Sequence, residues 1–321
     1  MNEFELIDYL TNDFKIYQEN VVAGIGDDCA VWREGDKYIV FTTDTMVEGD
    51  HFLKSWFTPE QIGQRLVETN VSDVASMGAI PTSMFVSLVI DDNTSPLWCR
   101  KMYDGIKRVA DKYKISLLGG NITHGKTLSL TLGVHGETIT NLVYRKGSTM
   151  GDLIVVTGTI GDACIARLML GKGLTVPTAL FNRLATPTAR VDDAQIIKQY
   201  ASAMIDISDG IASEARHIAK ASQLGVLINA TDIPYSSLAK KHEKDIDRSL
   251  LECALRGGED YELMFSISEE NFNKLQKHKD LISPLTVIGC ITKEMTNVYI
   301  ENDVVHDLPK GFDHFNENIN L

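Results

Sequence analysis

Carboxylate side chains recur at the edges of apolar segments in this sequence. Asp27 and Asp28 lie within a small and otherwise apolar stretch, residues 24–31. Further acids occur in residues 42–44, 70–73 and 206–209. A buried acid needs a metal ion, hydrogen-bond donors or a cation nearby. We therefore predict that these segments, which are far apart in the sequence, converge on magnesium and the phosphates of a nucleotide.

Each acid taken alone has a simpler explanation. Neighbours in an extended chain face opposite ways, so only one of Asp27 and Asp28 can point into a site. Asn70 and Asp73 are three residues apart on a predicted helix and project to one side, where exposed polar residues are common. Asp209 lies at the start of a predicted helix and could simply cap it. The recurrence of the pattern is what favours a shared site.

The composition is that of an ordinary globular chain with excess negative charge. Its 321 residues suffice for two domains, and 44% hydrophobic and 23% charged residues are typical values. A net charge of −13 argues against a general nucleic-acid or anionic-membrane binder, because these need a basic face. An acidic protein can still bind ATP when magnesium offsets the phosphate charge. We expect neither a nucleic-acid nor a membrane partner.

The cysteines and the first residues predict a cytoplasmic protein. The five cysteines are scattered and form no C-x-x-C pair, a pattern typical of free thiols in a reducing compartment. The first five residues are acidic where a secretion signal would be basic, and no apolar run approaches membrane length.

The predicted elements place the acids at strand ends and on one helix. Val67, Val71 and Val74 form the core stripe of a helix over residues 60–77. The other predicted helices span 4–19, 97–113, 162–170 and a segment after Gly210, and the predicted strands span 38–43, 84–90, 115–118, 128–134, 153–157, 204–207 and 263–267. Strands and helices without strict alternation predict two α+β domains. The small, polar residues 146–151 suggest a boundary that separates residues 1–147 from 148–321.

Residues 120–127 fit the phosphate-loop pattern G-x-x-x-x-G-K-[ST]. A true phosphate loop is followed at once by a helix, whose N-terminus helps to hold the phosphates. Here the next residues alternate between apolar and polar, which predicts a strand. We interpret the match as accidental. A phosphate-loop NTPase remains an alternative, in which Lys126 would be essential.

A series of motifs in order resembles the thiamine-monophosphate kinase family. They are GIGDDCA (24–30), TTDTMVEGDHF (42–52), NVSDVASMGA (70–79), GGN (119–121), YRKGSTMGD (144–152), VTGTIGD (156–162), DISDG (206–210), GGEDYEL (257–263) and GFDHF (311–315). The family is related to aminoimidazole ribonucleotide synthetase and selenophosphate synthetase. The resemblance implies an N-terminal domain that forms a homodimer by pairing strands, and a C-terminal α/β domain. ATP and several Mg²⁺ ions would lie in the cleft between the domains.

The resemblance also implies roles for individual residues. The magnesium shell would comprise Asp28, Thr42, Thr43, Asp44, Asp73, Asn121, Asp206 and Asp209. The nucleotide would contact Tyr103, Gly120, Asn121, Arg145 and Ser208, and thiamine monophosphate would contact His51, Glu259 and Phe312. Glu259 would offset the charge of the cationic substrate, and Phe312 would stack on an aromatic ring. Asn121 replaces an Asp that many relatives carry, which removes one charge and leaves the number of ions open.

The implied reaction moves the γ-phosphoryl group of ATP onto thiamine monophosphate and needs no dedicated catalytic base. The acceptor phosphate is already largely ionised near pH 7, because the second pKa of a phosphate monoester is about 6. Two alternatives remain. Another ATP-using enzyme of the superfamily is one, although no cysteine precedes Cys29, where selenophosphate synthesis normally requires one, and the chain lacks the C-terminal cysteine of hydrogenase-maturation homologues. A catalytically silent magnesium–nucleotide-binding module is the other, and Asn121 makes it conceivable.

Overall fold

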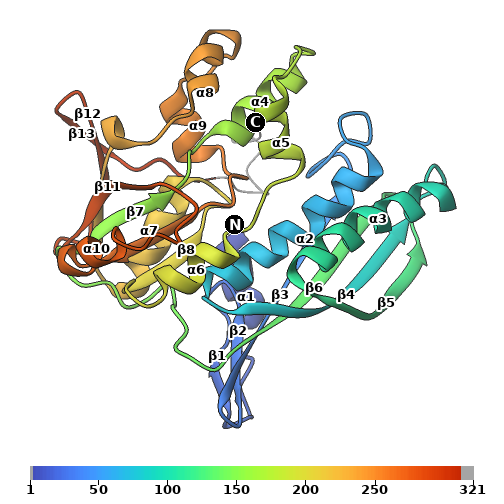
Figure 1. The fold of residues 1–321 in the computed structure, drawn as a ribbon, viewed down its shortest axis with the longest axis horizontal. Helices are drawn as coiled ribbons and strands as arrows, with labels where there is room; N and C mark the ends of the chain where they lie inside the picture. Colours follow the sequence, from blue (N-terminus) through green and yellow to red (C-terminus); the bar gives the residue numbers. More distant parts are fainter. Residues whose placement is uncertain (1–2, 312–321) are drawn as a thin grey trace.

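The computed structural model describes residues 3–311, which form two sheets with helices between and around them (Figure 1). The first sheet has the order β1-β2-β3-β6-β4-β5 and comprises β1 (Val21–Ala23), β2 (Ala30–Glu34), β3 (Lys37–Val47), β4 (Ile80–Ile90), β5 (Ser116–His124) and β6 (Ser129–Thr138). The second has the order β13-β12-β9-β11-β7-β10-β8 and comprises β7 (Leu153–Thr157), β8 (Ala203–Asp206), β9 (Gly225–Asn229), β10 (Leu263–Ile267), β11 (Leu285–Thr292), β12 (Asn297–Glu301) and β13 (Val304–Asp307). The predicted boundary after residue 147 falls in the connection between the sheets, residues 139–152, and stays a prediction.

Helix α2 (Pro59–Ser76) lies between the two halves of the molecule. It begins with a capping box: the Gln61 N–H donates to the Thr58 hydroxyl, and the Thr58 N–H donates to the Gln61 side chain. Pro59 occupies the first turn, where its missing N–H costs nothing. Together with α3 (Pro96–Tyr113), α2 covers one face of the first sheet (Figure 1).

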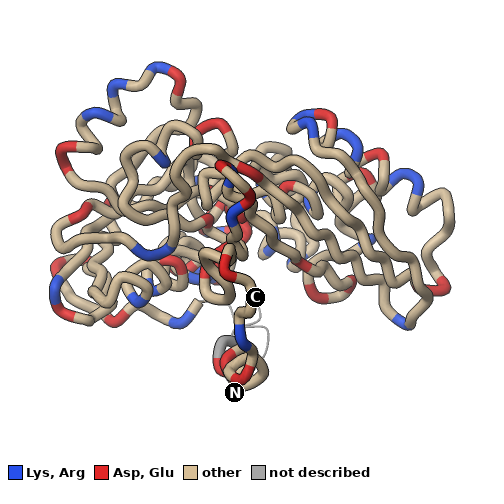
Figure 2. The backbone as a smooth tube through the Cα atoms, turned by 90° about the horizontal axis from the view of Figure 1, so that it is seen from below, with Lys and Arg blue, Asp and Glu red and all other residues tan. Residues whose placement is uncertain are grey.

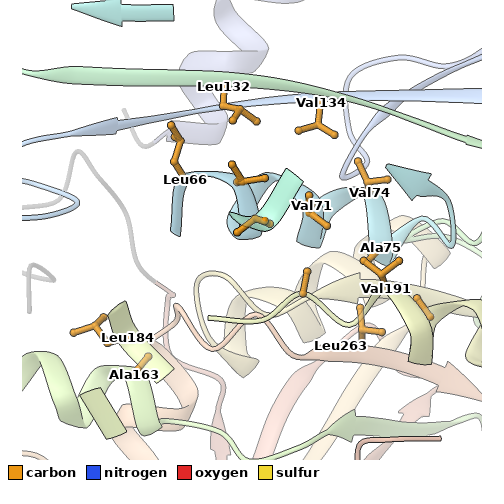
Figure 3. Close-up of a cluster of buried hydrophobic side chains, with 14 of the residues drawn as sticks. Leu66, Val71, Val74, Ala75, Leu132, Val134, Ala163, Leu184, Val191 and Leu263 are labelled. Atoms are coloured by element: carbon orange, nitrogen blue, oxygen red, sulfur yellow. The ribbon is translucent and has the colours of Figure 1, made fainter. Parts of the chain in front are cut away.

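The core of the protein continues through α2 into both halves. Leu66, Val71 and Val74 are fully buried and belong to one cluster with Leu132 and Val134 of β6 (Figure 3). The same cluster includes residues of the second half: Ala163, Leu184, Val191 and Leu263. Burying a side chain of this size contributes about 1.5–3 kcal/mol. Because α2 is packed from both sides, its polar side chains are held in fixed positions between the sheets.

The second half carries most of the remaining helices. They are α4 (Asp162–Gly171), α5 (Thr178–Ala185), α6 (Val191–Ile197), α7 (Ile211–Ser222), α8 (Ser237–His242), α9 (Leu250–Arg256) and α10 (Glu269–Leu275), with the short 3-10 helices η1 (Ala230–Asp232) and η2 (Glu243–Asp245). A second apolar cluster includes Ile205 of β8 with Ile211 and Ile218 of α7. This packing fixes the turn between β8 and α7, which carries two of the acids.

Two predicted elements have different limits in the structure. The helix predicted over 4–19 is α1 (Glu3–Thr11) and ends earlier. The strand predicted over 115–118 continues through Gly120 and Asn121 as β5, because β5 pairs in parallel with β4 over this stretch. Backbone pairing thus overrides the weak strand preference of glycine. The strand predicted after residue 127 is confirmed as β6, so a strand and not a helix follows the segment that resembles a phosphate loop.

Charged residues of both signs are interspersed along both halves of the tube in Figure 2. Among the residues that the structure describes, no helix has both the length and the apolar character needed to cross a bilayer.

Candidate active site

A cavity of about 870 Å³ is lined by residues from both halves of the chain. Its walls come from β3 and the loop after it, from α2 and α4, and from the segments 208–209 and 257–261. Many of the predicted site residues meet here: Asp28, Thr42, Thr43, Asp44, His51, Asp73, Arg145, Ser208, Asp209 and Glu259. The structure thus brings together residues that are up to about 230 positions apart, as the shared-site hypothesis requires.

Polar side chains of α2 hold strand β3 at the cavity. The Thr42 hydroxyl donates to Asp73 Oδ2 at 2.6 Å, and the Asp44 N–H donates to Asn70 Oδ1 at 3.0 Å. Asn70 is fully buried, so the polar flank of this helix faces the protein interior and not solvent. The sequence predicted that Asn70 and Asp73 share a side of the helix, and the structure shows what that side contacts.

Two serines of α2 orient carboxylates from other segments. The Ser72 hydroxyl donates to Asp206 Oδ2 at 2.7 Å, and the Ser76 hydroxyl donates to the Asp28 carboxylate. Arg145 Nε also donates to Asp28, at 2.7 Å. Asp206 therefore lies directly behind the cavity residues, bound to the same helix.

The acids repel one another at this site. Burial, followed by the charges of Asp44, Asp206 and Asp28, raises the pKa of Asp73 well above its ordinary value. Burial and the charge of Asp28 raise the pKa of Asp206 to about 8. The proximity of several carboxylates with too few cations is unfavourable in the protein alone, and divalent cations would relieve it.

The donor set fits magnesium that arrives together with phosphate. Within residues 3–311, no group of three or more His, Cys, Asp or Glu side chains converges closely enough to hold a metal ion alone. Mg²⁺ usually binds through one or two carboxylates, with phosphate oxygens and water completing its octahedron. Carboxylates spread around a cavity meet that requirement, whereas a closed protein cage is not present in the described chain.

The loop of residues 257–262 supports the β8–α7 turn. The Glu259 N–H donates to the Ser208 carbonyl at 2.8 Å, which continues the pairing of β10 with β8. Gly258 has φ of 60°, and a Cβ there would lie 2.1 Å from the Ser208 carbonyl oxygen, so only glycine fits. Glu259 and Tyr261 also adopt positive φ, 64° and 50°. Such backbone strain concentrates at functional sites because the surrounding structure must enforce it.

Glu259 lies between two arginines. The Arg65 guanidinium donates to its carboxylate, and Arg167 Nε lies 3.5 Å from Glu259 Oε2. Trp56 and Phe57 line the same cavity and supply aromatic surface. This part of the cavity therefore combines a fixed ion cluster with apolar walls.

His51 lines the cavity from the loop that follows β3. Its Nδ1 accepts a hydrogen bond from the Val47 N–H at 3.3 Å and lies 3.6 Å from the Asp50 carboxylate. The ring is held by its own loop and remains in the cavity wall.

Three predicted nucleotide residues lie elsewhere. Tyr103, Gly120 and Asn121 line a second, shallower hollow beside β5. Strand β5 is three strands from β3 in the sheet, a separation of roughly 14 Å. Asn121 is in register with Thr45, one row beyond Asp44, so the Asn121 side chain points to the opposite face from Asp44. Within one chain the structure does not bring Asn121 to the acids, and Phe312 lies outside the described residues.

Several residues of the site were not identified from the sequence. Ser72 and Ser76 are four residues apart on α2, a spacing that could have placed both on the face of Asp73. Arg65 and Arg167 gave no such signal, because a charged residue on a helix is usually solvated.

Comparisons with known proteins agree with this geometry. The model of the AIR synthase related protein, N-terminal domain, matches residues 26–138. The thiamine-monophosphate kinases of Aquifex aeolicus (strain VF5) and Escherichia coli (strain K12) are each 34% identical over 98% of this chain and 98% of their own length. The chain belongs to the thiamine-monophosphate kinase family. The resemblance found in the sequence motifs is therefore confirmed.

Solved structures of the family have the same fold. AaThiL complexed with AMPPCP and TMP is 32% identical, with a TM-score of 0.86 over 98% of this chain and 97% of that one. The hydrogenase maturation protein HypE of E. coli has a TM-score of 0.72 over 86% of this chain and 87% of that one, but at 18% identity it shows the fold alone. The α+β class and the aminoimidazole ribonucleotide synthetase-like fold are confirmed. The individual site residues and the dimer stay predictions.

Proposed function

We propose that this protein transfers the γ-phosphoryl group of ATP to thiamine monophosphate, giving thiamine diphosphate and ADP. The observation that carries the proposal is the acid-lined cavity between the two halves of a chain that thiamine-monophosphate kinases match over nearly its whole length. The likeness to a relative complexed with AMPPCP and TMP supports the same reaction, because AMPPCP resembles ATP.

Magnesium would be held at the acidic wall of the cavity. Asp28, Asp44, Asp73 and Asp209 would hold the ions, with Asp206 behind them and the oxygens of Thr42 and Thr43 beside them. The ions would offset the charge of two phosphate groups that otherwise repel each other. The raised pKa of Asp73 supports this role, since it reflects negative charge that the protein alone leaves uncompensated.

The side chains of the chain itself position the reactants. Arg145 is held by Asp28, with Nη2 and Oδ1 2.5 Å apart, and lines the cavity as a cation for the phosphates. Ser208 and Asp209 are fixed by the 257–262 loop. No residue has to remove a proton, because the acceptor oxygen is already ionised. Positioning and charge compensation then account for the chemistry.

A homodimer would explain the residues that lie apart. Strand β5 is an edge strand, and Leu117, Leu118 and Ile122 are 45%, 61% and 65% exposed on it. An exposed apolar edge strand favours pairing with another chain. Asn121 could then meet the nucleotide only if it came from a second copy, since it is about 14 Å from β3 in its own chain.

A product assay tests the function. The protein is incubated with ATP, Mg²⁺ and thiamine monophosphate, with free thiamine and other phosphate monoesters as control acceptors. Thiamine diphosphate formed from the monophosphate alone supports the proposal. Nucleotide binding without turnover would indicate the silent module, and turnover only on another acceptor would indicate another enzyme of the superfamily. The cytoplasmic location stays a prediction.

A further inference from the structure

We propose that Arg65 is a positioning residue for substrate recognition: it holds Glu259 so that one carboxylate oxygen is left to accept a hydrogen bond from the amino group of the substrate's pyrimidine ring. This inference rests on the proposed function and deepens it, because it says which part of thiamine monophosphate the cluster recognises.

Arg65 joins helix α2 to the second half of the chain. Its side chain is 3% exposed, and its guanidinium donates to both the Glu259 carboxylate and the Leu184 carbonyl. The guanidinium carbon also lies 5.9 Å from the centroid of the Phe57 ring. A buried guanidinium needs such partners, and its rigid fork allows it to hold two acceptors at once. The position of the Glu259 carboxylate is therefore set across the cavity from α2.

The charge of Glu259 is already balanced by the protein. Arg65 pairs with one oxygen, and Arg167 Nε lies 3.5 Å from the other. A carboxylate between two guanidinium groups contributes little net negative charge toward a ligand. This changes the interpretation from the sequence, in which Glu259 offsets the positive charge of the substrate.

What Glu259 still offers is one hydrogen-bond acceptor. Glu259 Oε2 is buried and accepts no hydrogen bond from the described part of the chain, because the Arg167 contact lacks hydrogen-bond geometry. An ionised carboxylate can only accept hydrogen bonds, and a buried acceptor left unsatisfied is costly. A ligand N–H aimed at Oε2 would remove that cost.

The surroundings of Glu259 match an aromatic ring that carries an amine. Trp56 and Phe57 line the cavity, with their ring centroids 6.3 Å apart and nearly perpendicular. Pockets of this kind use apolar walls for affinity and a few fixed polar groups for orientation. The aminopyrimidine of thiamine has a flat aromatic body and an exocyclic amine, whereas its thiazolium ring has no N–H to donate.

The main test compares Arg65→Met and Arg65→Lys with a matched control, Arg183→Met. Arg183 also pairs with a buried carboxylate, Glu262 at 2.8 Å, but does not line the cavity. We expect Arg65→Met to raise KM for thiamine monophosphate about tenfold or more, with kcat and KM for ATP within about threefold of wild type. Arg65→Lys should restore part of the affinity, because a lysine holds only one acceptor well. Arg183→Met should lower the melting temperature without changing KM.

A second measurement uses thiamine monophosphate in which oxygen replaces the pyrimidine amine. Calorimetric titration with Mg²⁺ and a non-hydrolysable ATP analogue should show that wild type prefers the amine by about tenfold or more, and that Arg65→Lys reduces this preference. Equal loss of affinity for both compounds, or an unchanged KM in folded Arg65→Met, would overturn the proposal. If Arg65→Met does not fold, Arg65→Lys decides by the same preference. Failure of wild type to phosphorylate thiamine monophosphate would instead contradict the proposed function.

Discussion

The Ser72 hydroxyl donates a hydrogen bond to Asp206 Oδ2 at 2.7 Å and so joins helix α2 to strand β8 of the second half. Both residues are buried, and the bond favours the ionised form of Asp206 against burial and the charge of Asp28. One hydroxyl thus connects the two halves and prepares a carboxylate behind the acid-lined cavity.

Replacing Ser72 with Ala should weaken magnesium binding. Without the hydroxyl, the ionised form of Asp206 loses a donor, so the Mg²⁺ concentration needed for half-maximal activity should rise about tenfold or more. Ser266→Ala is the matched control, since it removes a buried hydrogen bond to Ser148 at 2.8 Å away from the cavity. Equal magnesium dependence in wild type and Ser72→Ala would contradict the link.

Replacing Asp44 or Asp209 with Ala should stop turnover and leave the fold intact. Each carboxylate lines the cavity at its exposed side, so its loss opens no hole in the core. We expect kcat to fall about 10²–10³-fold or more, the loss typical of removing a group that stabilises transition-state charge. Circular dichroism and thermal melting check the fold. Near-normal rates in either variant would argue against the metal role.

Asp260→Asn should change how stability depends on pH. Burial raises the pKa of Asp260 to about 7, above its ordinary value of 3.8. Between about pH 4 and pH 7 the unfolded chain has therefore lost a proton that the folded chain keeps. The free energy of unfolding falls as pH rises through this window, by at most about 1.4 kcal/mol per pH unit, and the contribution is constant above it.

The Asp260→Asn variant keeps an acceptor for the Gly161 N–H, which Asp260 binds at 2.7 Å, but it does not titrate. Urea unfolding at pH 5, 6 and 7 should show a smaller decrease in stability with pH in the variant. Parallel pH profiles for the two proteins would show that Asp260 is ionised in the folded state.

Lys126→Ala should leave kinetics unchanged. Lys126 is exposed in the turn between β5 and β6, and no helix begins there to hold a phosphate. We expect kcat and KM for ATP within about twofold of wild type. A crippled variant would instead support the phosphate-loop alternative.

Charged residues on β5 should dissociate the proposed dimer. Leu118→Lys with Ile122→Lys places two like charges on the exposed edge strand, which opposes strand pairing. Sedimentation velocity should show a dimer for wild type and a monomer for the double variant. Ile282→Lys, at a residue that is 71% exposed in the second half, is the control and should stay dimeric. A monomeric wild type would refute the pairing.

The sequence by itself determined the local elements and the chemistry of the site. The valine stripe and the Thr58–Gln61 cap define α2, because helix period and capping depend on neighbours within a few residues. The recurring acids indicated a shared magnesium and nucleotide site, and the ordered motifs indicated the family. Local periodicity carries these signals without knowledge of the fold.

Only the tertiary structure decided which distant residues meet. Arg65 and Glu259 are 194 positions apart and pair because α2 is packed between two sheets. Asn121 lies away from Asp44 because β5 takes the edge of the sheet and β3 does not. Strand order and register arise from long-range backbone pairing and core packing, and the period of a single strand contains neither.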